Sequence, residues 1–359
     1  MDVAPRRRWR RGPTSILLRA AVQIKMRCCW TLGLLGLLAG LGGSGRGRAA
    51  AFSTARVSAP TEVLASVTRV AKDAARQAGV HFREAMGTAR AEVKKTKNTN
   101  QDLLTQIDPE CQAIITDIVT EAFPDHAFLG EEDVAPGPDA SRAALQAALK
   151  KSDWVWVVDP IDGTTNFVHA FPLSAVSIGV CYKGEVVAAA IYDPAADEMF
   201  WAERGTGAFL NDTPMMVGSQ ENLIEALVCA GSPPNTGPMR ASMRGVCMLA
   251  AKSRSVRMLG SAAIMLAWVA CGRLTAYFEP DLNSWDTAAG ALLVEEAGGM
   301  GTGHDRDGPG DAGAPYTVAS RAILFTNGKI HEEMRAELAK VQALSVLPED
   351  VDNVTTISV

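Results

Sequence analysis

Two carboxylates lie three residues apart in a segment that follows a short apolar strand. Asp159 and Asp162 come directly after residues 154–158, and Gly163 and Thr164 follow them. Carboxylates that enter one cleft repel each other unless a cation lies between them. The backbone N–H groups of a Gly-Thr turn are suited to bind a phosphate oxygen. A cation site joined to an anion site indicates metal-assisted hydrolysis of a phosphate ester.

Two further acidic segments extend this pattern. Glu131 follows the apolar residues 127–129, and Asp286 precedes a helix predicted over 287–297, which two glycines end. Mg²⁺ prefers oxygen ligands, so these acids are candidate ligands. Each has a simpler interpretation, because Asp286 could be only a helix N-cap and Glu131 only a solvated loop acid.

The three acidic segments together resemble the inositol monophosphatases, a family of magnesium-dependent, lithium-sensitive phosphatases. The resemblance rests on residues 130–132, 159–167 and 285–290, with 295–299 close by, and it covers residues 61–345 in the family's order. It implies a layered αβαβα architecture, two to three Mg²⁺ ions, a small phosphate monoester as substrate, hydrolysis by metal-activated water, and a homodimer.

The resemblance also assigns roles to individual residues. The metal ligands that it implies are Glu131, Asp159, the backbone carbonyl of Ile161, Asp162 and Asp286. The catalytic residues that it implies are Thr164, which orients the attacking water, Glu131, which helps to remove its proton, and Asp108, a buried acid behind the metals. Thr105 is expected to hydrogen-bond Thr164.

Substrate contacts are implied on both sides of the metal site. They are Lys97, Asp162, the N–H groups of Gly163 and Thr164, the N–H of Ala262, Glu279 and Asp286. Lys97 has a rival interpretation as one of several solvated lysines in a charged run. The metal segments do not separate inositol, galactose or histidinol phosphates, sugar bisphosphates or nucleotide 3′-phosphates. Inositol or galactose phosphate is favoured, and histidinol phosphate is the alternative; a non-catalytic regulatory relative is the second class considered.

Charge is distributed unevenly along the 359 residues, whose net charge is −5. Residues 1–51 contain ten of the 35 Lys and Arg and one of the 40 Asp and Glu, so the rest of the chain has a net charge of −14. An acidic body argues against nucleic acid as a partner. Cysteines 111, 181, 229, 247 and 271 form no Cys-x-x-Cys pair and are interpreted as buried free thiols.

The first 59 residues have the composition of a targeting sequence that is removed. Residues 6–27 are basic, residues 28–45 are uncharged, and small residues at 49–51 precede Phe52. This order is typical of a signal peptide, with a shorter basic region if Met26 is the true start. Phe52 after the cleavage point resembles the bipartite plastid-targeting sequences of algae, so a chloroplast enzyme without a membrane segment is expected. Secretion or the endomembrane system, a signal anchor and a plant-type transit peptide are the alternatives.

The remaining chain predicts an α+β half followed by an α/β half. In the first half, a helix is predicted from Thr61, and a hairpin from 174–182 and 186–192. In the second half, strands and helices alternate. The predicted catalytic domain therefore covers 60–345, with halves at 60–215 and 216–345, before a tail at 346–359. Residues 94–100 are predicted as a polar loop and 302–313 as a mobile loop.

Overall fold

The computed structural model describes residues 59–88, 95–96, 103–304 and 313–352. Residues 1–58 of the predicted targeting region, Lys97 and the last seven residues lie outside the described residues. One compact unit comprises residues 55–359. No helix within the described ranges is both long enough and apolar enough to cross a lipid bilayer.

The first sheet has seven strands in the order β3-β4-β5-β6-β7-β8-β9. Its strands are β3 (Ala127–Gly130), β4 (Trp154–Asp162), β5 (Ala175–Tyr182), β6 (Glu185–Asp193), β7 (Glu198–Glu203), β8 (Gly207–Leu210) and β9 (Thr213–Met215). Only β3 and β4 pair in parallel. The predicted hairpin is confirmed: Lys183 and Gly184 join β5 to β6 with φ angles of 52° and 84°, as a tight hairpin turn requires.

Helices cover both faces of this sheet because β4 is apolar on both sides. Trp156 and Val158 pack in one cluster with α1 (Thr61–Ala85) and α2 (Ile107–Ala122). Val155 and Val157, which alternate with them along the strand, pack in another cluster with α6 (Ala262–Ala270) and α7 (Ser284–Glu296). Helix α1 begins at Thr61, which confirms the predicted helix start. The shorter helices of this half are α3 (Pro138–Lys151), α4 (Thr164–Val168) and a 3-10 helix, η2 (Glu131–Asp133).

The second sheet has six strands in the order β11-β10-β12-β15-β13-β14. They are β10 (Leu227–Ala230), β11 (Ser255–Arg257), β12 (Ala276–Glu279), β13 (Met300–His304), β14 (Ala314–Pro315) and β15 (Ala322–Thr326). The strands β10, β11 and β12 are parallel, and the other pairs are antiparallel. Helices α5 (Thr236–Ala250) and α8 (His331–Lys340) pack on this sheet, and a 3-10 helix, η3 (Leu223–Glu225), precedes β10.

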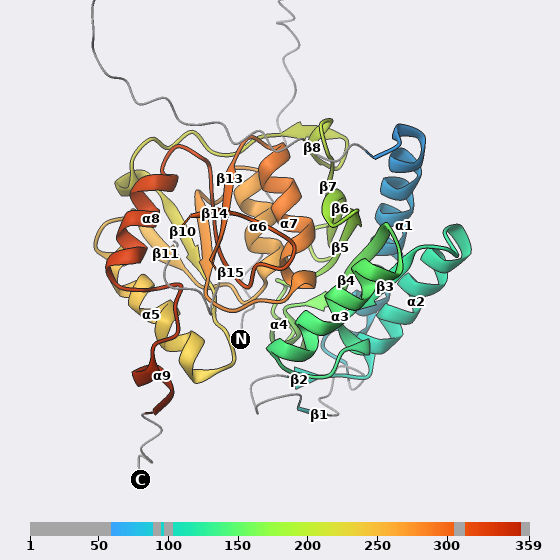
Figure 1. Ribbon diagram of the computed structural model, residues 1–359, viewed down its shortest axis with the longest axis horizontal. Coiled ribbons are helices and arrows are strands. Elements are labelled where there is room, and N and C mark those ends of the chain that lie inside the picture. Colours follow the sequence, from blue (N-terminus) through green and yellow to red (C-terminus); the bar gives the residue numbers. More distant parts are fainter. Residues whose placement is uncertain (1–58, 89–94, 97–102, 305–312, 353–359) are drawn as a thin grey trace, which may run out of the picture. The chain divides into compact units, whose positions relative to one another are not determined.

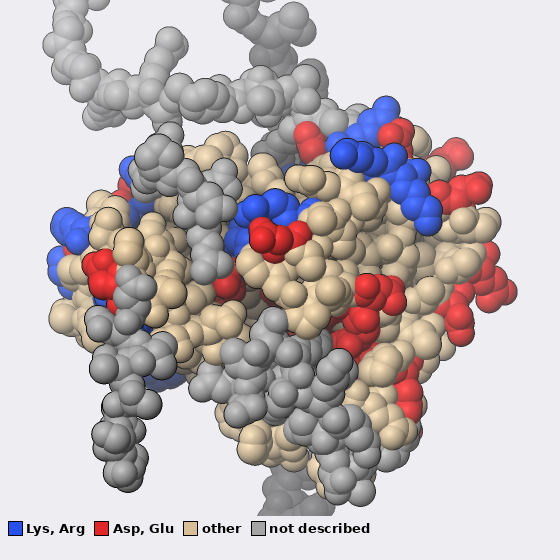
Figure 2. All heavy atoms as spheres, turned by 60° about the horizontal axis from the view of Figure 1, so that its bottom comes forward, with Lys and Arg blue, Asp and Glu red and all other residues tan. Residues whose placement is uncertain are grey.

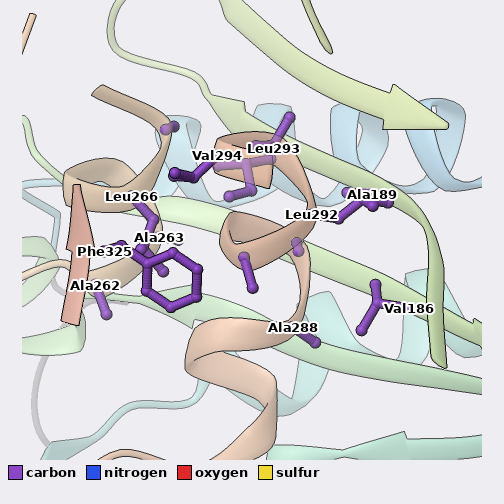
Figure 3. Packing of buried hydrophobic residues seen from close by; sticks show 14 of the residues in the cluster. Val186, Ala189, Ala262, Ala263, Leu266, Ala288, Leu292, Leu293, Val294 and Phe325 are labelled. Carbon is purple, nitrogen blue, oxygen red and sulfur yellow. The ribbon is translucent and has the colours of Figure 1, made fainter. Parts of the chain in front are cut away.

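The predicted αβαβα layering is confirmed. Figure 1 shows α1 and α2 outside the first sheet, α6 and α7 between the two sheets, and α5 and α8 outside the second. The middle layer is buried almost all round, as the apolar residues of both helices in Figure 3 show. Gly179 of β5 and Gly290 of α7 permit this close packing, because an added Cβ would lie 2.7 Å from Ala288 and 2.4 Å from Leu266, respectively.

Five sequence predictions about local structure need correction. Strand β4, expected to end at Val158, extends to Asp162, so Asp159 and Asp162 lie within it. Within the predicted polar loop 94–100, β1 (Lys95–Thr96) pairs with β2 (Leu103–Leu104). Within the predicted mobile loop 302–313, residues 302–304 belong to β13. Helix α7 begins at Ser284, three residues before the predicted start. Cys247 is exposed and Cys271 half-buried, whereas Cys111, Cys181 and Cys229 are buried; all five are free thiols.

A short helix near the end of the chain, α9 (Pro348–Asp352), packs against α5. The Arg244 side chain of α5 donates hydrogen bonds to the Asp350 carboxylate (2.6 Å) and to the carbonyls of Val341, Gln342 and Ser345. Asp350 is only 4% exposed. Arg244 therefore holds α9, and the segment that joins it to α8, against α5.

A buried histidine predicts how stability depends on pH. Both ring nitrogens of His331 form hydrogen bonds with threonine hydroxyls, Nε2 with Thr302 (3.3 Å) and Nδ1 with Thr326 (3.1 Å). Burial lowers its pKa from 6.5 to about 4. Between these values the unfolded chain binds a proton that the folded protein does not, so the free energy of unfolding falls as pH is lowered from 6.5 to 4, by up to about 3 kcal/mol.

The substitution His331→Gln is expected to remove this contribution. The difference in urea-unfolding free energy between pH 7.5 and pH 4.5 should then be smaller in the variant than in the wild-type protein. His169→Gln, which changes an exposed side chain at the end of α4, is the control and should keep the wild-type difference. An unchanged pH difference in His331→Gln would contradict the prediction.

Candidate active site

A shift in strand register brings Asp159 and Asp162 together at the end of β4. In a regular strand, residues three positions apart point to opposite faces. Here Asp159 pairs with Ser177 and Asp162 with Ala175, and the register shifts between these pairs. Each carboxylate can therefore place an oxygen within 4.8 Å of the other and of Asp286.

Asp286 comes from the first turn of α7, in the middle layer. The N–H of Asn283, the N-cap residue, donates to Asp286 Oδ2 at 2.6 Å. One carboxylate oxygen thus completes a capping box while an oxygen of the same group belongs to the acidic cluster. The two interpretations of Asp286, helix capping and cation binding, are compatible.

Asp162 is fixed by the start of α6. Its carboxylate accepts hydrogen bonds from the Ser261 hydroxyl, from the Ala262 N–H at 3.3 Å and from the Ala263 N–H at 2.8 Å. The Ala262 N–H, predicted to contact substrate, therefore points at Asp162. Its predicted role as a substrate contact stays a prediction.

Burial and mutual repulsion make the cluster reluctant to carry its full negative charge. Burial raises the pKa of Asp162, and the nearby charge of Glu131 raises it further. Burial also raises the pKa of Asp286 well above its usual value, with the charges of Glu131 and Asp162 adding to the effect. A cation bound between these groups would reverse both shifts, because it favours the ionised carboxylates.

A cavity of ≈ 260 Å³ contains this cluster. Nearly all of the predicted metal and substrate residues line it; they are Glu131, Asp159, Ile161, Asp162, Gly163, Thr164, Ala262, Glu279 and Asp286. Among the described lining residues, six are acidic and one, Arg321, is basic. The carboxylate oxygens of the cavity are the ligands that hard cations such as Mg²⁺ prefer. Because the six acids would repel a phosphate, bound cations are required before the anion can bind.

Asp108 lies behind the cavity and connects two threonines. Its Oδ1 accepts a hydrogen bond from the Thr164 hydroxyl (3.3 Å), and its Oδ2 accepts from the Thr105 hydroxyl (2.6 Å) and N–H (2.9 Å). The Thr164 hydroxyl also lies 3.1 Å from the Ile161 carbonyl. Thr105 and Thr164 were expected to hydrogen-bond each other directly. Instead, both hydroxyls donate to the Asp108 carboxylate, which connects them.

Glu279 lines the cavity from the end of β12. Glu279 is 5% exposed, and its carboxylate accepts a hydrogen bond from the hydroxyl of Tyr277, a fully buried residue. Burial raises the pKa of Glu279 well above its usual value. Gly231 packs so closely that an added Cβ would lie 2.0 Å from Glu279 Oε2, so the backbone there fixes the carboxyl position.

Several cavity residues were not predicted from the sequence. They are Ser232, Pro233, Pro234, Asn235, Asp281, Asn283 and Arg321. Ser261 carried a usable signal, because a serine directly before an apolar helix is a preferred N-cap. No local sequence signal indicated Arg321, since its hydrogen-bond partners are 38 to 180 residues away in the chain.

Charge on the protein surface agrees with the acidic composition. On the face drawn in Figure 2, acidic side chains gather toward the right of the view, while Lys and Arg lie in separate small groups. The described part of this face therefore shows no extended basic surface of the kind that nucleic-acid binding requires.

Comparison with known proteins gives matches over most of the chain. Residues 63–343 match the model of the inositol monophosphatase family. An inositol-1-monophosphatase of Synechocystis sp. is 37% identical over 239 residues, which cover 66% of this chain and 77% of that protein.

Solved structures show the same likeness. The extragenic suppressor protein suhB of Bartonella henselae matches with a TM-score of 0.65 and 33% identity, over 76% of this chain and 98% of that chain. Staphylococcus aureus inositol monophosphatase II, solved with inositol monophosphate bound, matches with a TM-score of 0.58 and 30% identity, over 76% of this chain and 94% of that chain.

Proposed function

The chain belongs to the inositol monophosphatase family, and from this premise we propose that it hydrolyses inositol monophosphate, or a closely related small polyol phosphate, with Mg²⁺ as its cofactor. The observation that carries the proposal is the group of buried Asp159 and Asp162 with half-buried Asp286, whose oxygens lie within 4.8 Å of one another in the cavity. The relative from Staphylococcus aureus binds inositol monophosphate.

Each residue of the site has a defined contribution to hydrolysis. Mg²⁺ held by Glu131, Asp159, the Ile161 carbonyl, Asp162 and Asp286 would activate water and neutralise phosphate charge. Thr164, bonded to Asp108, presents a hydroxyl oxygen that can accept a hydrogen bond from the attacking water and so orient it. Glu131, which lines the same cavity, would help to remove the proton of that water, as the family resemblance implies. No side chain is required as a covalent nucleophile.

The cavity favours a small polyol over a nucleotide. Its volume of ≈ 260 Å³ lies below the range of about 300–1,000 Å³ that is usual for larger organic ligands. Among its described lining residues there is no aromatic side chain on which a base could stack. Glu279, fixed by Tyr277, offers an oxygen to a substrate hydroxyl.

A second candidate substrate is histidinol phosphate. The carboxylates of Glu279 and Asp281 line the cavity and would attract the ammonium group of such a substrate. A non-catalytic regulatory role is the least favoured alternative, because the metal and water-orienting residues are complete within the described part of the site.

Phosphate release by the purified protein tests these proposals. With Mg²⁺, inositol 1-phosphate should be hydrolysed faster than galactose 1-phosphate, histidinol phosphate, fructose 1,6-bisphosphate or adenosine 3′,5′-bisphosphate. Removal of Mg²⁺ with EDTA should abolish hydrolysis, and Li⁺ should inhibit at millimolar concentration. A preference for histidinol phosphate would favour the second candidate, and no release despite Mg²⁺ binding would favour the regulatory role.

We also propose that residues 1–59 direct the protein to the plastid and that the enzyme is a homodimer. Plastid targeting is supported by a basic region, an uncharged region and small residues that precede Phe52 in this order. The homodimer is supported by the family resemblance. A fluorescent fusion of residues 1–59 that enters the endomembrane system alone would contradict the first. Light scattering that gives the mass of one 38.0-kDa chain would contradict the second.

A further inference from the structure

Arg321 is the one basic side chain among the described residues that line the cavity. It directly precedes β15, and only 12% of its side chain is exposed. Its backbone carbonyl accepts the N–H of Leu282 at 2.9 Å, so both its main chain and its side chain hold the segment that leads into α7.

The guanidinium group bonds to three residues, two in the segment before α7 and one in α3. Nε and Nη2 both donate to Asp281 Oδ1, at 2.9 and 2.7 Å. Nη1 donates to Asn283 Oδ1 at 2.8 Å and to the Ser141 hydroxyl at 3.0 Å. Ser141 belongs to α3, whose N-cap Gly137 and first residue Pro138 line the cavity from the other half of the protein. Arg321 therefore connects two walls of the cavity.

One of these bonds leads directly to the acidic cluster. Asn283 accepts from Arg321 through its side chain and donates from its backbone to Asp286 Oδ2 at 2.6 Å. The orientation of the Asp286 carboxylate thus depends on Asn283, and the position of Asn283 depends on Arg321.

Charge alone does not explain an arginine at this place. A positive charge close to Asp286 opposes the binding of a second positive charge, and Asp281 neutralises much of it. What arginine adds is geometry, because its planar group donates in several fixed directions at once, whereas a lysine ammonium offers one point.

We infer that Arg321 is a positioning residue that orients Asp286 for cation binding through Asn283. The inference rests on the proposed function in that Asp286 is taken as a ligand of the cation. Partners that orient metal ligands typically change metal affinity or activity by about 10–100-fold when they are replaced.

The test is Mg²⁺ binding to the substrate-free protein, measured by calorimetry on Arg321→Lys. This variant keeps the charge and loses the fork of donors. We expect Mg²⁺ to bind about tenfold more weakly and kcat to fall about 10–100-fold. Arg204→Lys is the matched control, since Arg204 is also largely buried and bonds Glu295 and the Val186 carbonyl outside the cavity. It should bind Mg²⁺ as the wild-type protein does.

A second variant tests the route through Asn283. Asn283→Ala should weaken Mg²⁺ binding to a similar degree, and the double variant should be no worse than either single one. Wild-type affinity in Arg321→Lys, or additive losses in the double variant, would overturn the inference. If Arg321→Lys does not fold, wild-type affinity in Asn283→Ala would overturn it. Failure of the proposed function is distinguishable, because the wild-type protein would then bind Mg²⁺ and release no phosphate.

Discussion

Replacing Asp159 with asparagine is expected to lower phosphate release by roughly a thousandfold, at least as much as the loss of one charge-stabilising group elsewhere. Asp159 is 3% exposed and belongs to the group of three carboxylates. Asparagine has nearly the same shape, and its side-chain oxygen can still accept the N–H of Ile161, as Asp159 does at 3.0 Å. The variant should therefore fold but lack one negative charge for the cation.

Thermal unfolding distinguishes this loss from a general defect. Without Mg²⁺, Asp159→Asn should be at least as stable as the wild-type protein, because one source of repulsion within the acidic cluster is gone. Addition of Mg²⁺ should stabilise the wild-type protein more than the variant. Asp193→Asn is a matched control, since Asp193 is equally buried and accepts the Ala195 N–H at 2.9 Å outside the cavity. Full activity of Asp159→Asn would refute the assignment of the metal site.

Replacing Thr164 with valine is expected to lower kcat by roughly a hundredfold, within the range for a group that assists proton transfer. Valine fills the same space but removes the hydroxyl that contacts Asp108 at 3.3 Å. Serine at this position should restore most of the activity. Because the Thr164 side chain orients water and is not a predicted metal ligand, the Mg²⁺ concentration for half-maximal rate should change little.

The control for Thr164→Val is Thr116→Val. Thr116 donates its hydroxyl hydrogen bond to the Gln112 carbonyl within α2 and does not line the cavity. It should retain wild-type kcat. If Thr164→Val were as fast as the wild-type protein, the attacking water would have to be oriented by another group.

The sequence predicts those parts of the site that local patterns determine. Asp159 and Asp162 lie at the end of a strand, Glu131 follows one, and Asp286 lies in the first turn of a helix, so their spacing and the apolar runs beside them indicate where they lie. The helix from Thr61 and the hairpin of β5 and β6 in the first half are predicted for the same reason. Apolar residues there alternate or recur with the period of the element that they form.

Elements that depend on distant partners are not predictable in this way. Strand β13 contains Gly301 and Gly303, which have poor strand propensity, and an added Cβ at these positions would meet Phe325 and Ser320. Helix α5 contains two glycines and a proline, which mask its periodicity. Likewise Cys247 lies in a partly apolar stretch, and only the packing of α5 decides which side of the helix faces solvent.

The contacts of α9 determine how far the chain can be truncated at its C-terminal end without a loss of packing. Similarity to the family ends at residue 343, yet Arg244 bonds to the Ser345 carbonyl and to the Asp350 carboxylate. Val346 and Val351 also approach Gly237, in the first turn of α5, two residues after the cavity residue Asn235. A fragment trimmed to the boundary of homology would thus expose the base of a substrate-facing wall. The physical unit for expression and crystallisation extends at least to residue 352.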